Sequence, residues 1–250
     1  MHYLNAFLIA FSTYSRIPVP RADWNEENRR YALCFFPLVG AALALALWLW
    51  TCLARGRSGL LFAAGAALLP LLVTGGIHMD GLMDTADALA SHAGPERRLE
   101  ILKDSRAGAF AVMACAGYLL AQTALWGELG PERVPLVLPG YAASRALSAM
   151  AAVCLRPARR EGMLAGFTKQ APRGAVVGSS LACLALCLGL WAWLGGTGYA
   201  ALMALILAGC LLIYRLRAYR DFGGVTGDLA GAFLEMTELC LLAAAALWRG

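Results

Sequence analysis

Seven apolar stretches of roughly twenty residues each follow one another along this 250-residue chain. That is the length at which an α-helix crosses the hydrocarbon core of a bilayer, about 20 residues. Inside lipid, helices satisfy their own backbone hydrogen bonds, so such stretches are helical. We therefore predict an all-α, polytopic membrane helical bundle that forms a single domain over residues 1–250. The predicted spans cover residues 33–54, 59–77, 107–126, 134–155, 175–194, 198–214 and 229–248.

A shorter apolar segment precedes the first predicted span. Residues Tyr3–Tyr14 are too few to cross a bilayer and are more polar than the later stretches, and Pro18 and Pro20 follow them. A short helix of this kind is typical of the membrane interface. We expect an N-terminal interfacial helix here.

The composition excludes two classes of protein. Apolar residues make up 60% of the chain and charged residues 15%, whereas soluble domains have about 45–50% and about 25%. A disordered chain or a basic nucleic-acid-binding arm is therefore excluded, and the expected partner is the lipid bilayer, with no nucleic acid. Small residues such as Gly65, Ala66 and Ala67 would permit close helix contacts, including those of a homo-oligomer, whose existence stays open.

The basic residues indicate how the chain is oriented. Cytoplasmic loops collect Lys and Arg. With the N-terminus inside and seven spans, 16 of the 21 Lys and Arg residues fall on the inside, 4 fall outside, and Arg145 lies within a span. Three long connections, 78–106, 156–174 and 215–228, then lie inside. We expect a multi-pass protein of the cell (inner) membrane whose chemistry faces the cytoplasm.

Three aspartates open the first of these connections. Asp80, Asp84 and Asp87 are spaced i, i+4 and i+7, so one helix face carries all three carboxylates. Carboxylate oxygens are the ligands of Mg²⁺, which binds one or two of them together with substrate phosphates. We predict a Mg²⁺ site, with a solvated acidic helix face as the alternative. His78 could orient a ligand or donate to a phosphate, or it is an ordinary interfacial histidine.

A second cluster contains two basic residues around an acid. Lys103 and Arg106 flank Asp104 just before the third predicted span. Arg binds phosphate oxygens through its planar fork and Lys binds them as a point charge. Anchoring to the membrane surface is the alternative, but an anchor gains nothing from an acid between its bases.

A third cluster precedes the last predicted span. Gly223, Gly224 and Gly227 supply flexible backbone, and Asp228 stands where the helix should begin. The exposed N–H groups of a helix N-terminus bind anions. The alternative is an ordinary Asp N-cap after a glycine turn.

Three ionisable residues lie within predicted spans. Glu235 and Glu238 are in the last span and Arg145 is in the fourth. Ionisable groups inside a membrane are energetically costly and are usually functional and paired. We expect Arg145 to pair with at least one of the glutamates, with a purely structural ion pair as the alternative. The whole set of acids, bases and glycine turns suits metal-assisted transfer on a diphosphate-like substrate.

Several motifs resemble one known family. The strings GGIHMDGLMDTADAL, RLEILKDSRAGAF and GGVTGDLAGAFLEMTEL are similar to signature segments of the cobalamin synthase family, the adenosylcobinamide-GDP ribazoletransferases. SRIPVP, FFPLVG, the pair Ser144 and Arg145, and REGM extend the resemblance over almost the whole chain. Separate motifs in the same order are more specific than any single acidic triplet.

The resemblance implies the last joining step of vitamin B12 assembly. The 3′-hydroxyl of α-ribazole, or of its 5′-phosphate, would attack the cobinamide-side phosphorus of adenosylcobinamide-GDP and release GMP. The expected metal ligands for Mg²⁺ are Asp80, Asp84, Asp87 and Asp228. The expected catalytic residues are Asp84, Lys103, Asp104 and Arg106, with the choice of general base left open. The expected substrate-binding residues are His78, Arg145, Gly224, Gly227, Glu235 and Glu238.

Three other classes compete with this interpretation. A CDP-alcohol phosphotransferase would need DGxxAR, and DGLMDT lacks the Ala-Arg. An aspartate-rich prenyltransferase would repeat its acidic motif on a second helix, and GGVTGD is a poor copy. A transporter would place its binding site near the midplane of the membrane, whereas most charges here gather at one face.

Overall fold

The computed structural model describes residues 2–159 and 161–248 and is built from helices. Over these ranges there is no strand, and one isolated bridge joins Pro157 to Val225. The elements are α1 (His2–Tyr14), α2 (Glu26–Arg29), α3 (Ala32–Leu53), α4 (Gly59–Thr74), α5 (Ile77–Ala90), α6 (Pro95–Ile101), α7 (Ala109–Leu129), the 3₁₀ helix η1 (Pro131–Leu136), α8 (Leu138–Cys154), α9 (Met163–Thr168), α10 (Arg173–Phe222) and α11 (Gly227–Leu247).

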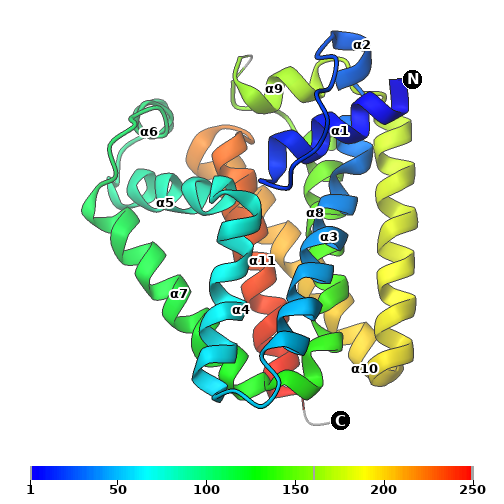
Figure 1. Ribbon diagram of the computed structural model, residues 1–250. Coiled ribbons are helices and arrows are strands. Elements are labelled where there is room, and N and C mark those ends of the chain that lie inside the picture. Colours follow the sequence, from blue (N-terminus) through cyan, green and yellow to red (C-terminus); the bar gives the residue numbers. More distant parts are fainter. Residues whose placement is uncertain (1, 160, 249–250) are drawn as a thin grey trace.

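The long helices form a bundle that can span a membrane (Figure 1). Five segments are long and apolar enough to cross a bilayer, namely α3, α7, η1 with α8, α10 and α11. The number rises to six when α4 and α5, bent by 97° at their junction, are counted as one broken span. The predicted all-α, polytopic bundle is confirmed.

Helix α10 reverses direction in its middle. At 1.5 Å per residue a straight helix of this length would reach about 75 Å, more than twice the hydrocarbon thickness. Gly196 interrupts it with φ 82° and ψ 169°. In Figure 1 the first half (yellow) runs away from α1 and the second half (orange) returns. The two halves correspond to the predicted spans 175–194 and 198–214.

The predicted connection 215–228 is largely helical. Helix α10 continues to Phe222, and only residues 223–226 separate it from α11. Arg215, Arg217 and Arg220 end the apolar run without ending the helix. Basic residues are favourable near a helix C-terminus, because the carbonyl end carries partial negative charge. The helix therefore extends beyond its apolar segment.

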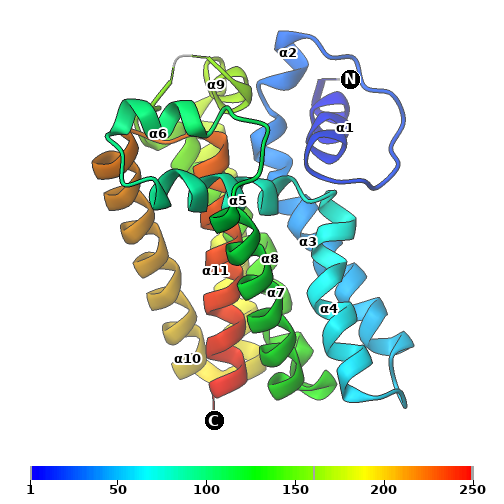
Figure 2. The same cartoon turned by 90° about the vertical axis from the view of Figure 1, so that its left-hand side faces the viewer.

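Two glycines turn the chain sharply between α4 and α5. Gly75 and Gly76 have φ of 67° and 79°, a left-handed conformation that glycine adopts without steric cost. Helix α5 therefore leaves the direction of α4 and lies across one end of the bundle, with α6 alongside it (Figure 2). The acidic connection is thus a helix at one face of the bundle.

Helix α1 lies at the same end of the molecule as α5, α6 and α9 (Figure 1). Its residues Ile9, Ala10 and Phe11 are buried in a cluster with residues of α3. The predicted N-terminal helix at Tyr3–Tyr14 is therefore present, as a helix that packs against α3. Below it, α3 and α8 meet closely, since a Cβ on Gly40 would lie 2.1 Å from the Tyr141 carbonyl oxygen.

The small residues on α4 contact other helices of the same chain. A Cβ on Gly65 would lie 2.1 Å from the Trp50 ring of α3, so glycine is needed there. Ala66 and Ala67 are buried in the main core, which also contains Trp126 of α7. These residues therefore serve contacts within one chain.

Candidate functional site

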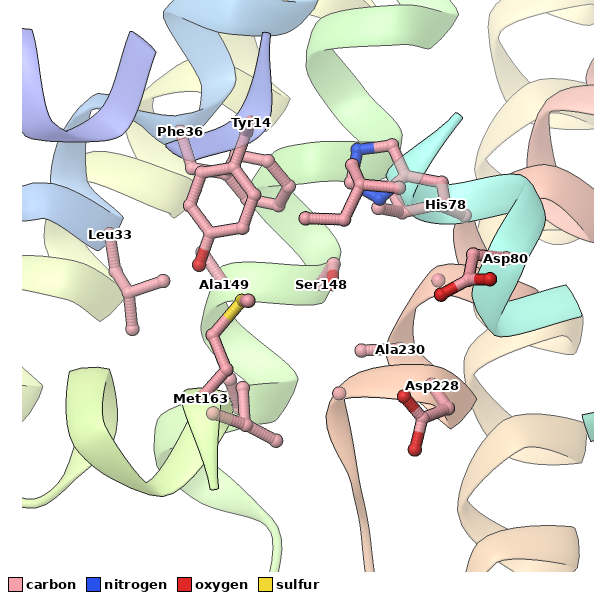
Figure 3. Close-up of a pocket in the computed structure, with 16 residues that line it drawn as sticks. Tyr14, Leu33, Phe36, His78, Asp80, Ser148, Ala149, Met163, Asp228 and Ala230 are labelled. Atoms are coloured by element: carbon pink, nitrogen blue, oxygen red, sulfur yellow. The ribbon is translucent and has the colours of Figure 1, made fainter. Parts of the chain in front are cut away.

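Helices α5 and α11 approach one another to backbone contact. A Cβ on Gly81 would lie 2.5 Å from the carbonyl oxygen of Asp228. A Cβ on Gly231 would lie 3.0 Å from the carbonyl oxygen of His78. The two glycines thus allow the acidic helix to lie directly against the start of the last span, which brings Asp80 and Asp228 to one cavity (Figure 3).

The Gly81→Ala substitution is expected to destabilise the protein by about 1–3 kcal/mol, the usual cost of overpacking. The added methyl group would force α5 away from α11. Thermal unfolding in detergent measures the effect. Gly117→Ala on α7 is the matched control, because a Cβ there meets nothing within 4 Å. Equal unfolding temperatures for the two variants would contradict the close approach.

A cavity of about 150 Å³ lies between α1, α3, α5, α8, α9 and α11 (Figure 3). We call it the aromatic cavity. Tyr14 and Phe36 form one side with ring centroids 4.3 Å apart, and His78 lies between these rings and Asp80. Aromatic and aliphatic walls with a few polar groups are typical of a small-molecule site. Its lining includes Tyr14, Leu33, Phe36, His78, Asp80, Ser148, Ala149, Met163, Asp228 and Leu234.

A second cavity of about 170 Å³ adjoins the first and is called the polar cleft. The two share Met163, Leu164, Gly227 and Asp228. The polar cleft adds Leu102, Arg159 and Glu161 to the lining. Sequence reasoning missed Arg159 because it treated the basic residues after α8 only as orientation signals, although Arg159 acts electrostatically on Asp228.

Asp80 and Asp228, from distant parts of the chain, line the aromatic cavity, and Asp84 lies near them without lining either cavity. Burial, followed by the negative charges of Asp80, Asp228 and Asp87, raises the pKa of Asp84 to about 6. Proximity of like charges disfavours ionisation. Asp80, Asp84 and Asp228 therefore form an acidic cluster that would be stabilised by a cation.

Asp87 has a different set of partners. Its two carboxylate oxygens accept hydrogen bonds from the backbone N–H groups of Gly108 at 2.6 Å and Ala111 at 2.8 Å. These N–H groups belong to the first turn of α7, where no helical partner exists. Asp87 therefore caps α7 from a neighbouring helix, which is a structural role that the spacing of the aspartates did not reveal.

The acidic cluster has suitable chemistry for Mg²⁺. Among the described residues, no group of three His, Cys, Asp or Glu side chains is already arranged around a common metal position. Magnesium, however, keeps several waters and takes only one or two carboxylates plus substrate phosphates. Asp80, Asp84 and Asp228 offer oxygen donors of this kind, so the residues fit the predicted ion.

The raised pKa of Asp84 predicts a pH effect on stability. In protein freed of metal by a chelator, the folded Asp84 carboxyl binds its proton below about pH 6, whereas the same carboxyl in the unfolded chain has a pKa near 3.8. The folded state therefore binds more protons between these values, and stability falls as pH rises through 6. We expect the melting temperature of the parent protein to be higher at pH 5 than at pH 7. The difference between the two pH values should be smaller in Asp84→Asn, which lacks the titrating carboxyl. The same pH dependence in both proteins would contradict this assignment.

Lys103, Asp104 and Arg106 lie in the exposed loop between α6 and α7. Arg106 donates to the Asp104 carboxylate from Nε at 3.0 Å and from Nη2 at 2.8 Å. These hydrogen bonds lower the pKa of Asp104 to about 2. A carboxylate of such low basicity is a poor proton acceptor, so the arrangement disfavours Asp104 as general base. Leu102 connects this loop to the polar cleft.

Two arginines hold the preceding helix α6 in place. Arg98 forms an ion pair with Asp221 at the end of α10, with Nη1 3.1 Å from Oδ1. Arg159 donates a hydrogen bond to the carbonyl oxygen of Leu99. The loop that follows α6 is thereby fixed beside the polar cleft.

The ionisable residues of the spans lie behind the lining of the aromatic cavity, with the Arg145 guanidinium carbon 6.0 Å from the centroid of the Phe36 ring. Arg145 and Glu238 form a buried ion pair, with Nη1 2.5 Å from Oε1, and the Ser144 hydroxyl donates to the same oxygen at 2.9 Å. The expected partnership between Arg145 and a glutamate is confirmed. Glu235 is also buried, and its carbonyl oxygen accepts from the Tyr118 hydroxyl at 3.3 Å. Arg145, Glu235 and Glu238 line neither cavity.

The predicted glycines divide between two roles. Gly224 packs against the chain after α8, since a Cβ there would lie 2.5 Å from the backbone nitrogen of Ala158. Next to it, the Val225 N–H donates to the Arg156 carbonyl oxygen at 2.9 Å. Gly227 lines both cavities. Gly224 thus supports the loop, and Gly227 lies at the site.

Histidine 78 is buried at the edge of the aromatic cavity. Burial, and secondarily the positive charge of Arg145, lowers the pKa of His78 well below its usual value. The imidazole is therefore neutral at neutral pH, with one ring nitrogen as donor and the other as acceptor.

Comparison with known proteins identifies the family. The sequence pattern of the cobalamin-5-phosphate synthase family matches residues 6–246. A Lachnoclostridium phytofermentans protein named adenosylcobinamide-GDP ribazoletransferase is 38% identical over 96% of this chain and 92% of its own length. Proteins of the same name from Desulfitobacterium hafniense and Pseudomonas putida are 37% and 35% identical, over 94% and 96% of this chain and 93% and 98% of their own lengths.

No solved structure matches the chain significantly. The family pattern nevertheless covers nearly the whole sequence, including the acidic cluster, the loop after α6 and the start of α11. The chain belongs to the cobalamin-5-phosphate synthase family.

Proposed function

We propose that this chain transfers the adenosylcobinamide phosphoryl group from adenosylcobinamide-GDP to α-ribazole, or to its 5′-phosphate, and releases GMP. The names of its relatives support this activity. The structural observation that carries the proposal is that Asp80 of α5 and Asp228 of α11 line one cavity. Two carboxylates at one cavity are oxygen donors for a cation, and a cation held there would neutralise the charge around the reacting phosphorus of a diphosphate.

The proposed step exchanges one phosphorus–oxygen bond for another. The 3′-oxygen of α-ribazole bonds to the cobinamide-side phosphorus, and the bond from that phosphorus to the bridging oxygen breaks. GMP leaves with the bridging oxygen. An aspartate that does not hold the metal would accept the hydroxyl proton. Arg159 and Lys103 would offset the charge on departing GMP.

Magnesium is part of the proposal. Asp80, Asp84 and Asp228 would hold it, and when bound it would neutralise the negative charge of the diphosphate. The three carboxylates are supplied by two helices in backbone contact at Gly81. This contact supports the proposal, because it brings carboxylates from distant parts of the chain close to one cavity.

We further propose that the site faces the cytoplasm from the inner membrane. The placement of the basic segments supports this orientation. The loop after α6 and the end of α10, which carry basic residues, lie at the same end of the bundle as α9, which lines the polar cleft (Figure 2). Cytoplasmic segments are enriched in Lys and Arg.

The purified full-length chain in detergent provides the test. With adenosylcobinamide-GDP, α-ribazole and Mg²⁺, we expect GMP and the joined cobalamin product to form in equal amounts. A chelator should strongly decrease the yield of both products. Comparing α-ribazole with its 5′-phosphate identifies the preferred acceptor. A protein that binds the substrates without releasing GMP would exclude the proposed activity and favour a transporter.

A further inference from the structure

The aromatic cavity contains a polar group that the phosphoryl-transfer chemistry does not use. His78 lines the cavity and is 5% exposed, and its Nε2 atom is buried with no hydrogen-bond partner among the described residues. A buried polar atom without a partner costs free energy. The Ser148 hydroxyl lies at the same cavity (Figure 3). His78 therefore has hydrogen-bonding capacity that no described residue uses, and it lies at the wall of a cavity that could admit a ligand.

The walls of the cavity suit a flat ring. Tyr14 and Phe36 lie 4.3 Å apart, and the His78 ring is within 19° of parallel to Tyr14 at a centroid separation of 6.3 Å. Aromatic faces of this kind attract planar aromatic ligands. The volume of about 150 Å³ equals that of an engineered cavity that accommodates benzene, about 150 Å³. A small ring system fits this space, whereas a corrin macrocycle is far too large.

The polarity of the cavity favours one of the two heterocyclic bases in the substrates, benzimidazole, over the other, guanine. Guanine carries several hydrogen-bond donors and acceptors, and most would remain unpaired against Leu33, Phe36 and Ala149. Unpaired polar groups strongly disfavour binding. The benzimidazole of α-ribazole has one unsubstituted ring nitrogen, which is an acceptor. One buried donor is sufficient for it.

We infer that the aromatic cavity binds the benzimidazole base of the acceptor nucleoside, with the His78 imidazole donating a hydrogen bond to its free ring nitrogen. This inference rests on the proposed function. The opposite side of the cavity carries Asp80 and Asp228 (Figure 3). A nucleoside whose base packs against these aromatic rings therefore extends its ribose toward the carboxylates, where its 3′-hydroxyl is needed. His78 acts as a specificity residue for the acceptor.

Steady-state kinetics with both substrates tests this assignment. His78→Phe retains a flat ring and removes the donor, and we expect the KM for α-ribazole to rise about tenfold, the effect of one hydrogen bond. The KM for adenosylcobinamide-GDP should not change. His78→Gln restores a donor and should recover part of the affinity.

A second variant tests the cavity itself from a position that tolerates change. Met163 lines the cavity but is 58% exposed, so Met163→Trp should narrow the cavity without disturbing the core. Met113→Trp on α7 is the matched control, because Met113 is 57% exposed and lies outside the lining. We expect the KM for α-ribazole to rise in the first variant alone. No change in either, or a rise only in the KM for adenosylcobinamide-GDP, would overturn the assignment.

Binding of free 5,6-dimethylbenzimidazole separates this inference from the proposed function. In the wild-type protein it should raise the melting temperature, and this shift should shrink in Met163→Trp but not in Met113→Trp. This binding measurement needs no turnover, so it tests the benzimidazole site even if no GMP is released. The absence of GMP release would refute the proposed function alone. The absence of any shift in the folded wild-type protein would refute the base site.

Discussion

Replacing Asp80 or Asp228 with asparagine is expected to reduce GMP release by about a hundredfold to a thousandfold, the range for loss of one charge-stabilising group. Each substitution keeps the shape of the side chain and removes one negative charge from the acidic cluster. The metal would then be held by fewer charged oxygens, and the diphosphate would keep more of its own charge. Initial rates of GMP release at saturating Mg²⁺ measure the effect.

The control for this prediction is Glu96→Gln on α6. Glu96 is an exposed acid on the adjacent helix and lines neither cavity, so its neutralisation should leave the rate unchanged. Melting temperatures of all three variants should stay near that of the parent, since Asp80 is exposed and Asp228 is half-buried. Full activity of Asp80→Asn and Asp228→Asn would rule out the carboxylate site.

The largest effect on stability is expected at the buried ion pair. Arg145→Met leaves Glu238 buried without its cation, and breaking such a pair by removing one partner costs about 3–5 kcal/mol. The Ser144 hydroxyl and its 2.9 Å hydrogen bond to Glu238 cannot replace a full charge. Denaturant or thermal unfolding in detergent measures the loss.

The double variant Arg145→Met with Glu238→Leu distinguishes a stabilising role from a substrate-binding one. Replacing both charges with apolar side chains removes the uncompensated ion, so most of the lost stability should return. Because neither residue lines a cavity, we expect the double variant to retain GMP release. A stable double variant that is inactive would instead place Arg145 and Glu238 in substrate binding, as their position within spans first indicated.

The apolar stretches of the sequence predicted the helical bundle well, because a helix needs a certain number of apolar residues to span the membrane. The reversal at Gly196 fell between two predicted spans, and the N-terminal helix was found at nearly its predicted bounds. The sequence did not show that helix α10 continues to Phe222, past the end of the predicted span at residue 214. Hydropathy detects where the lipid ends, and α10 carries its basic residues on a helix that extends past that point.

The site was predicted less completely than the fold. The i, i+4, i+7 spacing correctly put three aspartates on one helix face, but it could not show that Asp87 caps α7 through Gly108 and Ala111. Likewise, the closeness of Asp104 and Arg106 in the sequence suggested two catalytic groups. It did not show that the Arg106 guanidinium donates a hydrogen bond to the Asp104 carboxylate. Tyr14, Ser148 and Arg159 were missed because each contributes through a contact between distant segments.

The three attachments of α5 have a consequence for how substrates reach the site. The helix is joined to α4 by the glycine bend, touches α11 at Gly81, and holds the first turn of α7 through Asp87. It cannot tilt without displacing three spans. We therefore expect a bulky substrate to approach from the side away from α5, where the six-residue helix α9 presents Met163 to solvent. The carboxylates of α5 would keep their positions relative to α11.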